Sequence, residues 1–429
     1  MAIAAAPFAT VPTPSQRLGR DTGIDLVRAI CVLGVVLLHA LMVGVTVVDG
    51  SPVFANASDG TGWIAPLSWL LQVMPLFFVI GGFSGLLAYR GSRQRGRTAH
   101  WFIVGRLHRL LRPAIITIGI VGLALALLTI IGVPADLLEV AGFRYGQPLW
   151  FLAVFLLCQA LLPAFAAAHE RAPFLTLGAL VAAAIGVDAL RAVSGIDAVG
   201  FLNLAFVWLV LQQLGFFLAD GRIDALRRRT RAVAGLGALA LLISSFLTGV
   251  HSPDLIANIS PPTTALLLVG VVHTSAVSLL RERIERWSRA AAASAFTAFV
   301  TPRSMTIYLW HMPVLLVMAG ATALLSTHTG LELPPLDSVG WWAARPMWLA
   351  VALALTALVA VFAARFERRP VSAFVGSSGR VTAAVLAGLV GLLLLLVLGS
   401  SVATIAIAVA LIAASLRLTR PADAVVVAA

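Results

Sequence analysis

The feature that most constrains this chain is a series of twelve apolar segments, each about as long as a bilayer is thick. A helix needs about 20 mostly apolar residues to cross the hydrocarbon core of a membrane. Such windows lie at residues 26–48, 63–89, 113–133, 148–168, 173–190, 199–219, 232–250, 263–280, 304–326, 343–364, 381–398 and 401–416. Because backbone groups in lipid must be hydrogen-bonded internally, these segments are expected to be helices. The sequence therefore predicts an all-α, polytopic membrane helical bundle.

Composition supports the bilayer as the main solvent of the chain. Of its 429 residues, 60% are hydrophobic and only 11% are charged, whereas a soluble domain carries about 25% charged residues. So few charges cannot cover a water-facing surface of this size. The connections between the windows are too short for separate folded domains, so any chemistry is expected within the bundle or at its mouths.

The arginines indicate an orientation. The chain has no lysine, and 27 of its 30 arginines fall on alternate connections; the other three are Arg144, Arg191 and Arg345. Positive connections stay in the cytoplasm, which predicts an inner (plasma) membrane protein with both termini cytoplasmic. The net charge of +12 then reflects topology and attraction to anionic lipid. No nucleic-acid partner is expected.

Four regions are predicted along the chain. Residues 1–22 contain three prolines and no charged stretch before an apolar one, so a flexible cytoplasmic tail is expected and not a signal peptide. Residues 23–370 are expected to form a ten-helix core, and 371–418 an additional transmembrane hairpin. Residues 419–429 are expected to be a second cytoplasmic tail.

Ionisable residues inside membrane spans are costly and therefore suggest function. His39 lies about thirteen residues into the first window, and Arg28 precedes it by eleven residues. Eleven residues at about 100° each return close to the same helix face, so both side chains are expected to line one groove. A neutral core histidine bonded to the backbone is the alternative for His39.

Two further features lie near expected helix ends. Arg106 and Arg109 share a helix face beside Pro113, which is expected to open the next span. They could bind phosphate oxygens, or they could only anchor the positive end of the helix. Trp150 opens another span from the outer side, where an interfacial tryptophan is the simplest interpretation.

The remaining features are a second histidine and a glycine pair. His311 lies about two turns inside a late window, and a core histidine is again the alternative. Pro75, Gly81 and Gly82 predict a kinked or closely packed helix. No zinc spacing can be built from the two cysteines of the chain, and no metal is expected.

Together these stretches resemble the acyltransferase-3 family of integral membrane O-acyltransferases. The resemblance covers roughly residues 20–370 and includes an Arg, ten residues and a His (Arg28, His39), and an Arg-x-x-Arg (Arg106, Arg109). It also includes Trp-Phe-Leu from Trp150 and Tyr-Leu-x-His ending at His311. The family often has Ser-Gly-Phe where this chain has Gly-Gly-Phe, residues 81–83.

The resemblance implies transfer of an acyl group, most often acetyl, from cytosolic acyl-CoA to a hydroxyl of an extracytoplasmic sugar or glycolipid. His39 is then expected to be the general base. Arg28, Arg106, Arg109, Trp150 and His311 are expected to bind donor or substrate. The alternative is a twelve-helix secondary transporter or exporter, which would predict internal symmetry and paired broken helices.

Overall fold

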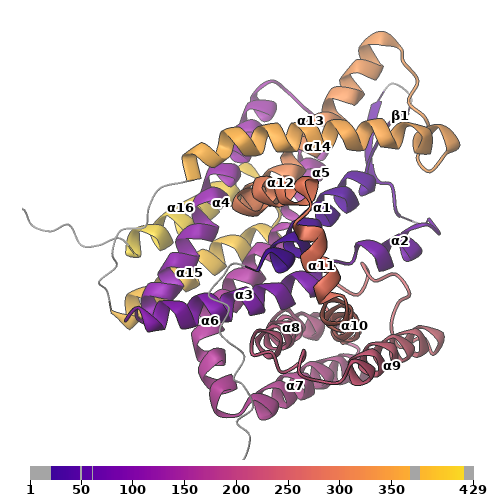
Figure 1. Cartoon of the computed structure of the whole chain (residues 1–429). Helices are drawn as coiled ribbons and strands as arrows, with labels where there is room; N and C mark the ends of the chain where they lie inside the picture. Colours follow the sequence, from indigo (N-terminus) through magenta and orange to yellow (C-terminus); the bar gives the residue numbers. More distant parts are fainter. Residues whose placement is uncertain (1–20, 49–50, 60, 368–376, 420–429) are drawn as a thin grey trace, which may run out of the picture.

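The computed structural model describes residues 21–48, 51–59, 61–367 and 377–419, which form a helical bundle with one short β-hairpin (Figure 1). The elements are α1 (Thr22–Met42), β1 (Val43–Val48), β2 (Ser51–Asn56), α2 (Ile64–Leu71), α3 (Met74–Gln94), α4 (Ala99–Ile130), α5 (Ala135–Gly146), α6 (Leu149–Arg171), α7 (Pro173–Ser194), η1 (Asp197–Leu202), α8 (Asn203–Ala219), α9 (Arg228–Leu247), α10 (Ala265–Leu279), α11 (Arg281–Ser288), α12 (Ala291–Val300), η2 (Thr301–Arg303), α13 (Ser304–Thr329), α14 (Val339–Glu367), α15 (Ser378–Val397) and α16 (Val402–Leu418). Most of both expected tails lies outside the described residues. The all-α polytopic class is confirmed.

Every expected window overlaps at least one helix. Within the described ranges, ten helical segments are long and apolar enough to cross a membrane, or eleven if α10 and α11, bent by 68°, count as one span. The seventeen residues of α16 fall short of that length. The chain is therefore a multi-pass membrane protein, and the count of twelve spans stays a prediction.

The first span is shorter than expected and ends at Met42. The residues that follow form β1, which pairs antiparallel with β2 in the register Val43 to Asn56 and Val48 to Ser51. β1 reads VGVTVV, a β-branched run that suits a strand. The window over residues 26–48 was wrong at its end because apolar character alone cannot separate a strand from the last turns of a helix.

The expectation that Pro113 opens a span is also wrong. α4 begins at Ala99, where the Thr98 side chain caps it by accepting from the Trp101 amide, and it continues through Pro113. Neighbouring helices and hydroxyls let a membrane helix tolerate an internal proline, and Thr117 donates its hydroxyl to the Pro113 carbonyl. The Arg-x-x-Arg pair therefore lies within a continuous helix.

Several connections expected to be loops contain helices. α5 occupies most of residues 134–147, and α11 and α12 occupy most of residues 281–303. Pro134 immediately precedes α5 and a run of good helix formers follows it. These short helices were missed because they are too short or too polar to register as membrane spans.

The glycine pair of α3 lies in a close helix contact, as the sequence predicts. A Cβ on Gly82 would lie 2.2 Å from the Gln212 carbonyl oxygen of α8, and one on Gly215 would lie 2.0 Å from the Val79 oxygen. Backbones can approach this closely only with small residues between them. The break in this span falls between α2 and α3, and Pro75 is in the first turn of α3.

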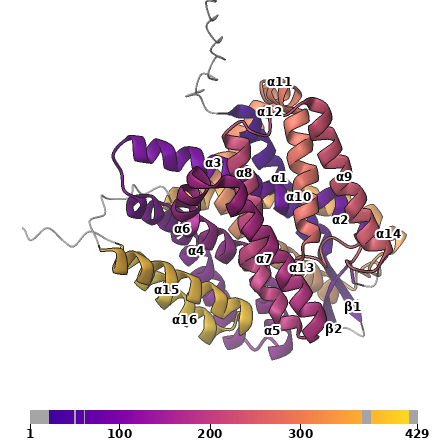
Figure 2. The same cartoon turned by 90° about the horizontal axis from the view of Figure 1, so that it is seen from below.

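The C-terminal hairpin of α15 and α16 packs along α4 and α6 (Figure 2). At one end Nε2 of His108 lies 2.8 Å from the Thr419 hydroxyl. At the other end a Cβ on Gly142 of α5 would lie 2.2 Å from the Ser400 carbonyl oxygen. The hairpin is therefore packed onto the core along its length, and His108 connects it to the helix that carries Arg106 and Arg109.

Candidate active site

The two intramembrane histidines indicated by the sequence lie against each other. His39 is in the last turn of α1, and His311 is about two turns into α13. Their ring centroids are 5.0 Å apart, and the ring planes are inclined at 54°. The packing of α1 along α13 thus joins two motifs from opposite ends of the sequence.

Each imidazole is oriented by a carbonyl on its own helix. Nδ1 of His39 is 2.9 Å from the Val35 oxygen, and Nδ1 of His311 is 2.5 Å from the Tyr308 oxygen. A carbonyl can only accept, so Nδ1 carries the proton and Nε2 of the neutral ring keeps its lone pair. Both rings therefore present the nitrogen that can accept a proton.

The histidines differ in access. His311 is fully buried, and its Nε2 has no hydrogen-bond partner among the described residues. His39 is half-buried. Nε2 of His311 is therefore available to accept a hydrogen bond. His39 is the ring that such a substrate can reach more easily.

An aromatic layer connects this pair to the Trp-Phe-Leu stretch of α6. The Tyr308 hydroxyl donates to the Pro148 carbonyl, and the Tyr308 and Phe151 rings are 4.8 Å apart. Trp150 packs 5.2 Å from Trp208. The tryptophan is therefore a member of a helix-packing aromatic layer, and the nearer contact to the histidine motif is made by Phe151.

Arg28 lies on α1, and it has both an acidic and a hydroxyl partner. Its guanidinium is 3.2 Å from Asp25 and 2.5 Å from the Ser84 hydroxyl of α3. Ser84 was not singled out from the sequence, although it directly follows the Gly-Gly-Phe stretch. A hydroxyl therefore does reach Arg28 from α3, one residue beyond the stretch where the family often has its serine.

Arg106 and Arg109 lie on α4 without a carboxylate. The Arg106 guanidinium lies 4.9 Å from the centre of the Phe102 ring, and the charges of Arg109 and Arg28 act on it. No ion pair of Arg106 or Arg109 occurs in the part of the chain that the structure describes. Three guanidiniums thus share one electrostatic neighbourhood, which suits a ligand that carries phosphate groups.

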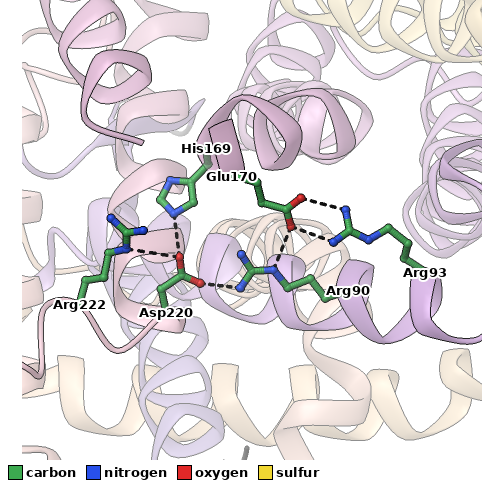
Figure 3. Close-up of polar contacts among 6 residues, drawn as sticks. All are labelled: Arg90, Arg93, His169, Glu170, Asp220 and Arg222. Atoms are coloured by element: carbon green, nitrogen blue, oxygen red, sulfur yellow. Dashed lines mark hydrogen bonds and ion pairs between the residues drawn. The ribbon is translucent and has the colours of Figure 1, made fainter. Parts of the chain in front are cut away.

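A different set of arginines closes the ends of α3, α6 and α8 (Figure 3). Arg93 donates to Glu170 at 2.9 Å, and Arg90 bonds both Glu170 at 3.3 Å and Asp220 at 2.5 Å. Asp220 also meets His169 at 3.1 Å and Arg222 at 3.7 Å. Each of these arginines has a carboxylate partner within the protein, so this network fastens three helix ends together.

The charge of Asp220 is well stabilised in this network. Burial raises the pKa of its carboxyl, but hydrogen bonds from His169 and Arg90 outweigh that effect and lower the pKa to about 2. The carboxylate therefore stays ionised at any physiological pH.

A family model described as an acyltransferase domain matches residues 21–365. The chain belongs to the acyltransferase-3 family. A comparison with the curated proteins finds no match, and a comparison with the solved structures finds none either. The matched range runs from the start of α1 to the last turns of α14 and ends before the C-terminal hairpin.

Membership of an acyltransferase family favours an enzyme over the transporter alternative. The two histidines in contact can take the proton of an acceptor hydroxyl, and Arg106 and Arg109 can hold an anionic donor. Among the described residues, no group of three or more His, Cys, Asp or Glu side chains could hold a metal ion.

Proposed function

We propose that this acyltransferase moves an acyl group, most often acetyl, from acyl-CoA to a hydroxyl of an extracytoplasmic sugar or glycolipid. The observation that carries the proposal is the contact between His39 and His311, with Nδ1 of each ring engaged by a carbonyl and Nε2 left as an acceptor. Acyl transfer to a hydroxyl requires a proton acceptor of this kind, because the hydroxyl proton must leave as the new carbon–oxygen bond forms.

The donor is expected at the arginine-rich end of the bundle. Arg106 and Arg109 would bind the phosphates of CoA, with Arg28 on α1 as a third cation. Eleven residues of α1 separate Arg28 from His39, which is about 16 Å of helix. In this proposal an extended pantetheine arm covers that distance along α1 and brings the thioester to the histidine pair.

The chemistry at the pair balances without a further reactant. Nε2 of His39 takes the proton of the acceptor hydroxyl while the hydroxyl oxygen attacks the thioester carbonyl. The tetrahedral intermediate collapses, the carbon–sulfur bond breaks, and the thiolate takes the proton back from the imidazolium. The products are the ester and free CoA. The buried Nε2 of His311 would accept a second hydrogen bond from the acceptor and so position it.

The orientation of the chain follows from the same proposal. The excess of arginine on one side supports an inner-membrane protein with both termini in the cytoplasm, so acyl-CoA arrives at the side where Arg106 and Arg109 lie. His39 is in the last turn of α1, close to the β-hairpin. An acceptor can therefore approach it from the extracytoplasmic side.

Replacement of His39 tests the proposal. The full-length protein in nanodiscs is supplied with labelled acetyl-CoA and a hydroxyl acceptor, and label in the acceptor is measured. His39→Ala should lower turnover by about 10² or more, while His328→Ala, at an exposed histidine on the same helix as His311, should leave it unchanged. Normal turnover in His39→Ala would refute the assignment of His39.

A further inference from the structure

A pocket of about 440 Å³ opens between α13 and α14 beside the β-hairpin. Its lining residues include Val45, Met318, Leu333, Trp341, Arg345 and Trp348. Most of this lining is apolar, and Met347 at its border is 71% exposed. In a membrane-embedded bundle, an apolar surface of this kind faces lipid chains. A single charged side chain in such a pocket therefore needs an explanation.

Arg345 is that charged side chain. The residue is only 7% exposed, and its one hydrogen bond in the described structure is from Nη1 to the Val43 carbonyl of β1, 3.2 Å away. Its Nε has no partner, and no carboxylate pairs with it among the described residues. Buried charges are normally paired because an isolated one is costly, so an anionic group bound at Arg345 would be stabilised.

The two tryptophans of the pocket hold this guanidinium in place. It lies 3.9 Å from the centre of the Trp341 ring and 5.0 Å from that of Trp348, which are cation–π distances. The guanidinium therefore covers one face of each of these rings. What the guanidinium can still offer is its N–H edge, which matches a phosphate.

The pocket adjoins the histidine pair. Trp348 donates its indole N–H to the carbonyl of Ala40, 3.0 Å away, and Ala40 directly follows His39. Met318 lies seven residues after His311 on α13, which places it two turns along on the same face, about 10 Å farther. The pocket thus opens on the side of the pair opposite to Arg28.

We propose that this pocket binds a phosphate-bearing, lipid-anchored acceptor. Its phosphate lies on Arg345, its hydrocarbon chain follows the apolar wall toward the bilayer, and its hydroxyl-bearing head extends toward His39. This assignment rests on the proposed acyl transfer, and it makes Arg345 a positioning residue for the acceptor. A bulk phospholipid carries the same head chemistry, so the test separates these two sources.

The test measures binding without turnover. The full-length protein in phosphatidylcholine nanodiscs is titrated with farnesyl phosphate, farnesol or inorganic phosphate, and tryptophan fluorescence is followed. Farnesyl phosphate should bind about tenfold more tightly than farnesol, and inorganic phosphate should bind weakly. Arg345→Gln should remove the preference for the phosphate. Arg345→Lys keeps the positive charge but removes the bidentate N–H edge of the guanidinium, so it should retain part of the preference for farnesyl phosphate. This variant also shows whether a loss of binding in Arg345→Gln comes from misfolding.

Arg191→Gln is the matched control, because Arg191 already pairs with Asp197 at 2.8 Å; it should bind both probes like the wild type. Equal binding of the two probes by the wild type, or an unchanged preference in Arg345→Gln, would overturn the proposal. Loss of farnesyl phosphate binding when phosphatidylglycerol is added would identify bulk lipid as the occupant and also overturn it. An inactive protein that keeps the phosphate preference would contradict the acyl-transfer mechanism and not this site.

Discussion

Two groups of arginines near one end of the bundle differ in how their charge is compensated. Arg90 and Arg93 on α3 meet the carboxylates of Glu170 and Asp220. Arg106 and Arg109, one helix later, have no carboxylate in the described part of the chain. The first group is called the paired arginines below, and the second the open arginines.

This difference distinguishes arginines that fasten helices to one another from arginines that can bind a ligand. The carboxylates that pair with the paired arginines come from α6 and from the end of α8, so these ion pairs hold helix ends together. The charge of Arg109 acts unfavourably on that of Arg106, and an anion from outside would relieve this repulsion. A positive-inside count treats all of these residues alike, and only the tertiary partners distinguish them.

Within this comparison, the larger effect is expected from the open arginines. Arg106→Lys with Arg109→Lys keeps the positive charge but removes the two guanidinium forks. Acyl-CoA affinity should fall about 10- to 100-fold, the loss of one or two charge-assisted hydrogen bonds. Calorimetry on the purified double variant measures the change, and abundance should stay normal.

Arg93→Lys provides the matched control, since it makes the same exchange in the paired group. It should leave acyl-CoA affinity unchanged. If the double variant bound the donor as well as the wild type, Arg106 and Arg109 would be anchoring residues and the comparison would fail.

A smaller effect on stability is expected from the paired group. Asp220→Asn removes the carboxylate that meets Arg90, His169 and Arg222. The free energy of unfolding should fall by about 1–3 kcal/mol, with acyl-CoA affinity unchanged. Thermal unfolding measures it, and Asp197→Asn, in an exposed pair with Arg191, should change little. A stable Asp220→Asn variant with weakened donor binding would reverse the roles assigned to the two groups.

The smallest effect is a dependence of stability on pH. The pKa of Asp220 is lowered to about 2 in the folded protein, whereas it is about 3.9 in an unfolded chain. The unfolded state therefore binds the proton first, and the stabilisation is complete above about pH 4 and lost as pH falls toward 2. The difference between the unfolding midpoints of the wild type and Asp220→Asn should therefore shrink as the pH is lowered from 5 to 4 and to 3. A constant difference would contradict this origin.

The sequence predicts the helical fold well because apolar length alone determines where a membrane helix can form. It fails where the same residues permit another local structure. The β-branched run of β1 continues the apolar window of α1, and Pro113 marks no boundary because α4 runs through it from Ala99 to Ile130. Apolar length registers neither the pairing of β1 with β2 nor the continuity of α4 through its proline.

The sequence predicts which residues form the candidate site but not how these residues contact one another. His39, His311 and the arginines of α1 and α4 can be chosen because ionisable residues in spans are rare. The contact between the two histidines and the bond from Arg28 to Ser84 arise from the packing of α1 against α13 and α3. Trp150 is chosen by its motif, although Phe151 makes the contact to Tyr308.

The most direct test of the account is the acyl-transfer rate of His39→Gln. Glutamine can hydrogen-bond but cannot accept the proton, so a general base is lost while a polar side chain is kept. We predict turnover at least about 10²-fold below the wild type, with acyl-CoA affinity measured by calorimetry unchanged. Near-normal transfer by His39→Gln would make His39 a structural hydrogen-bonding residue, contradict the account and transfer the role of base to His311.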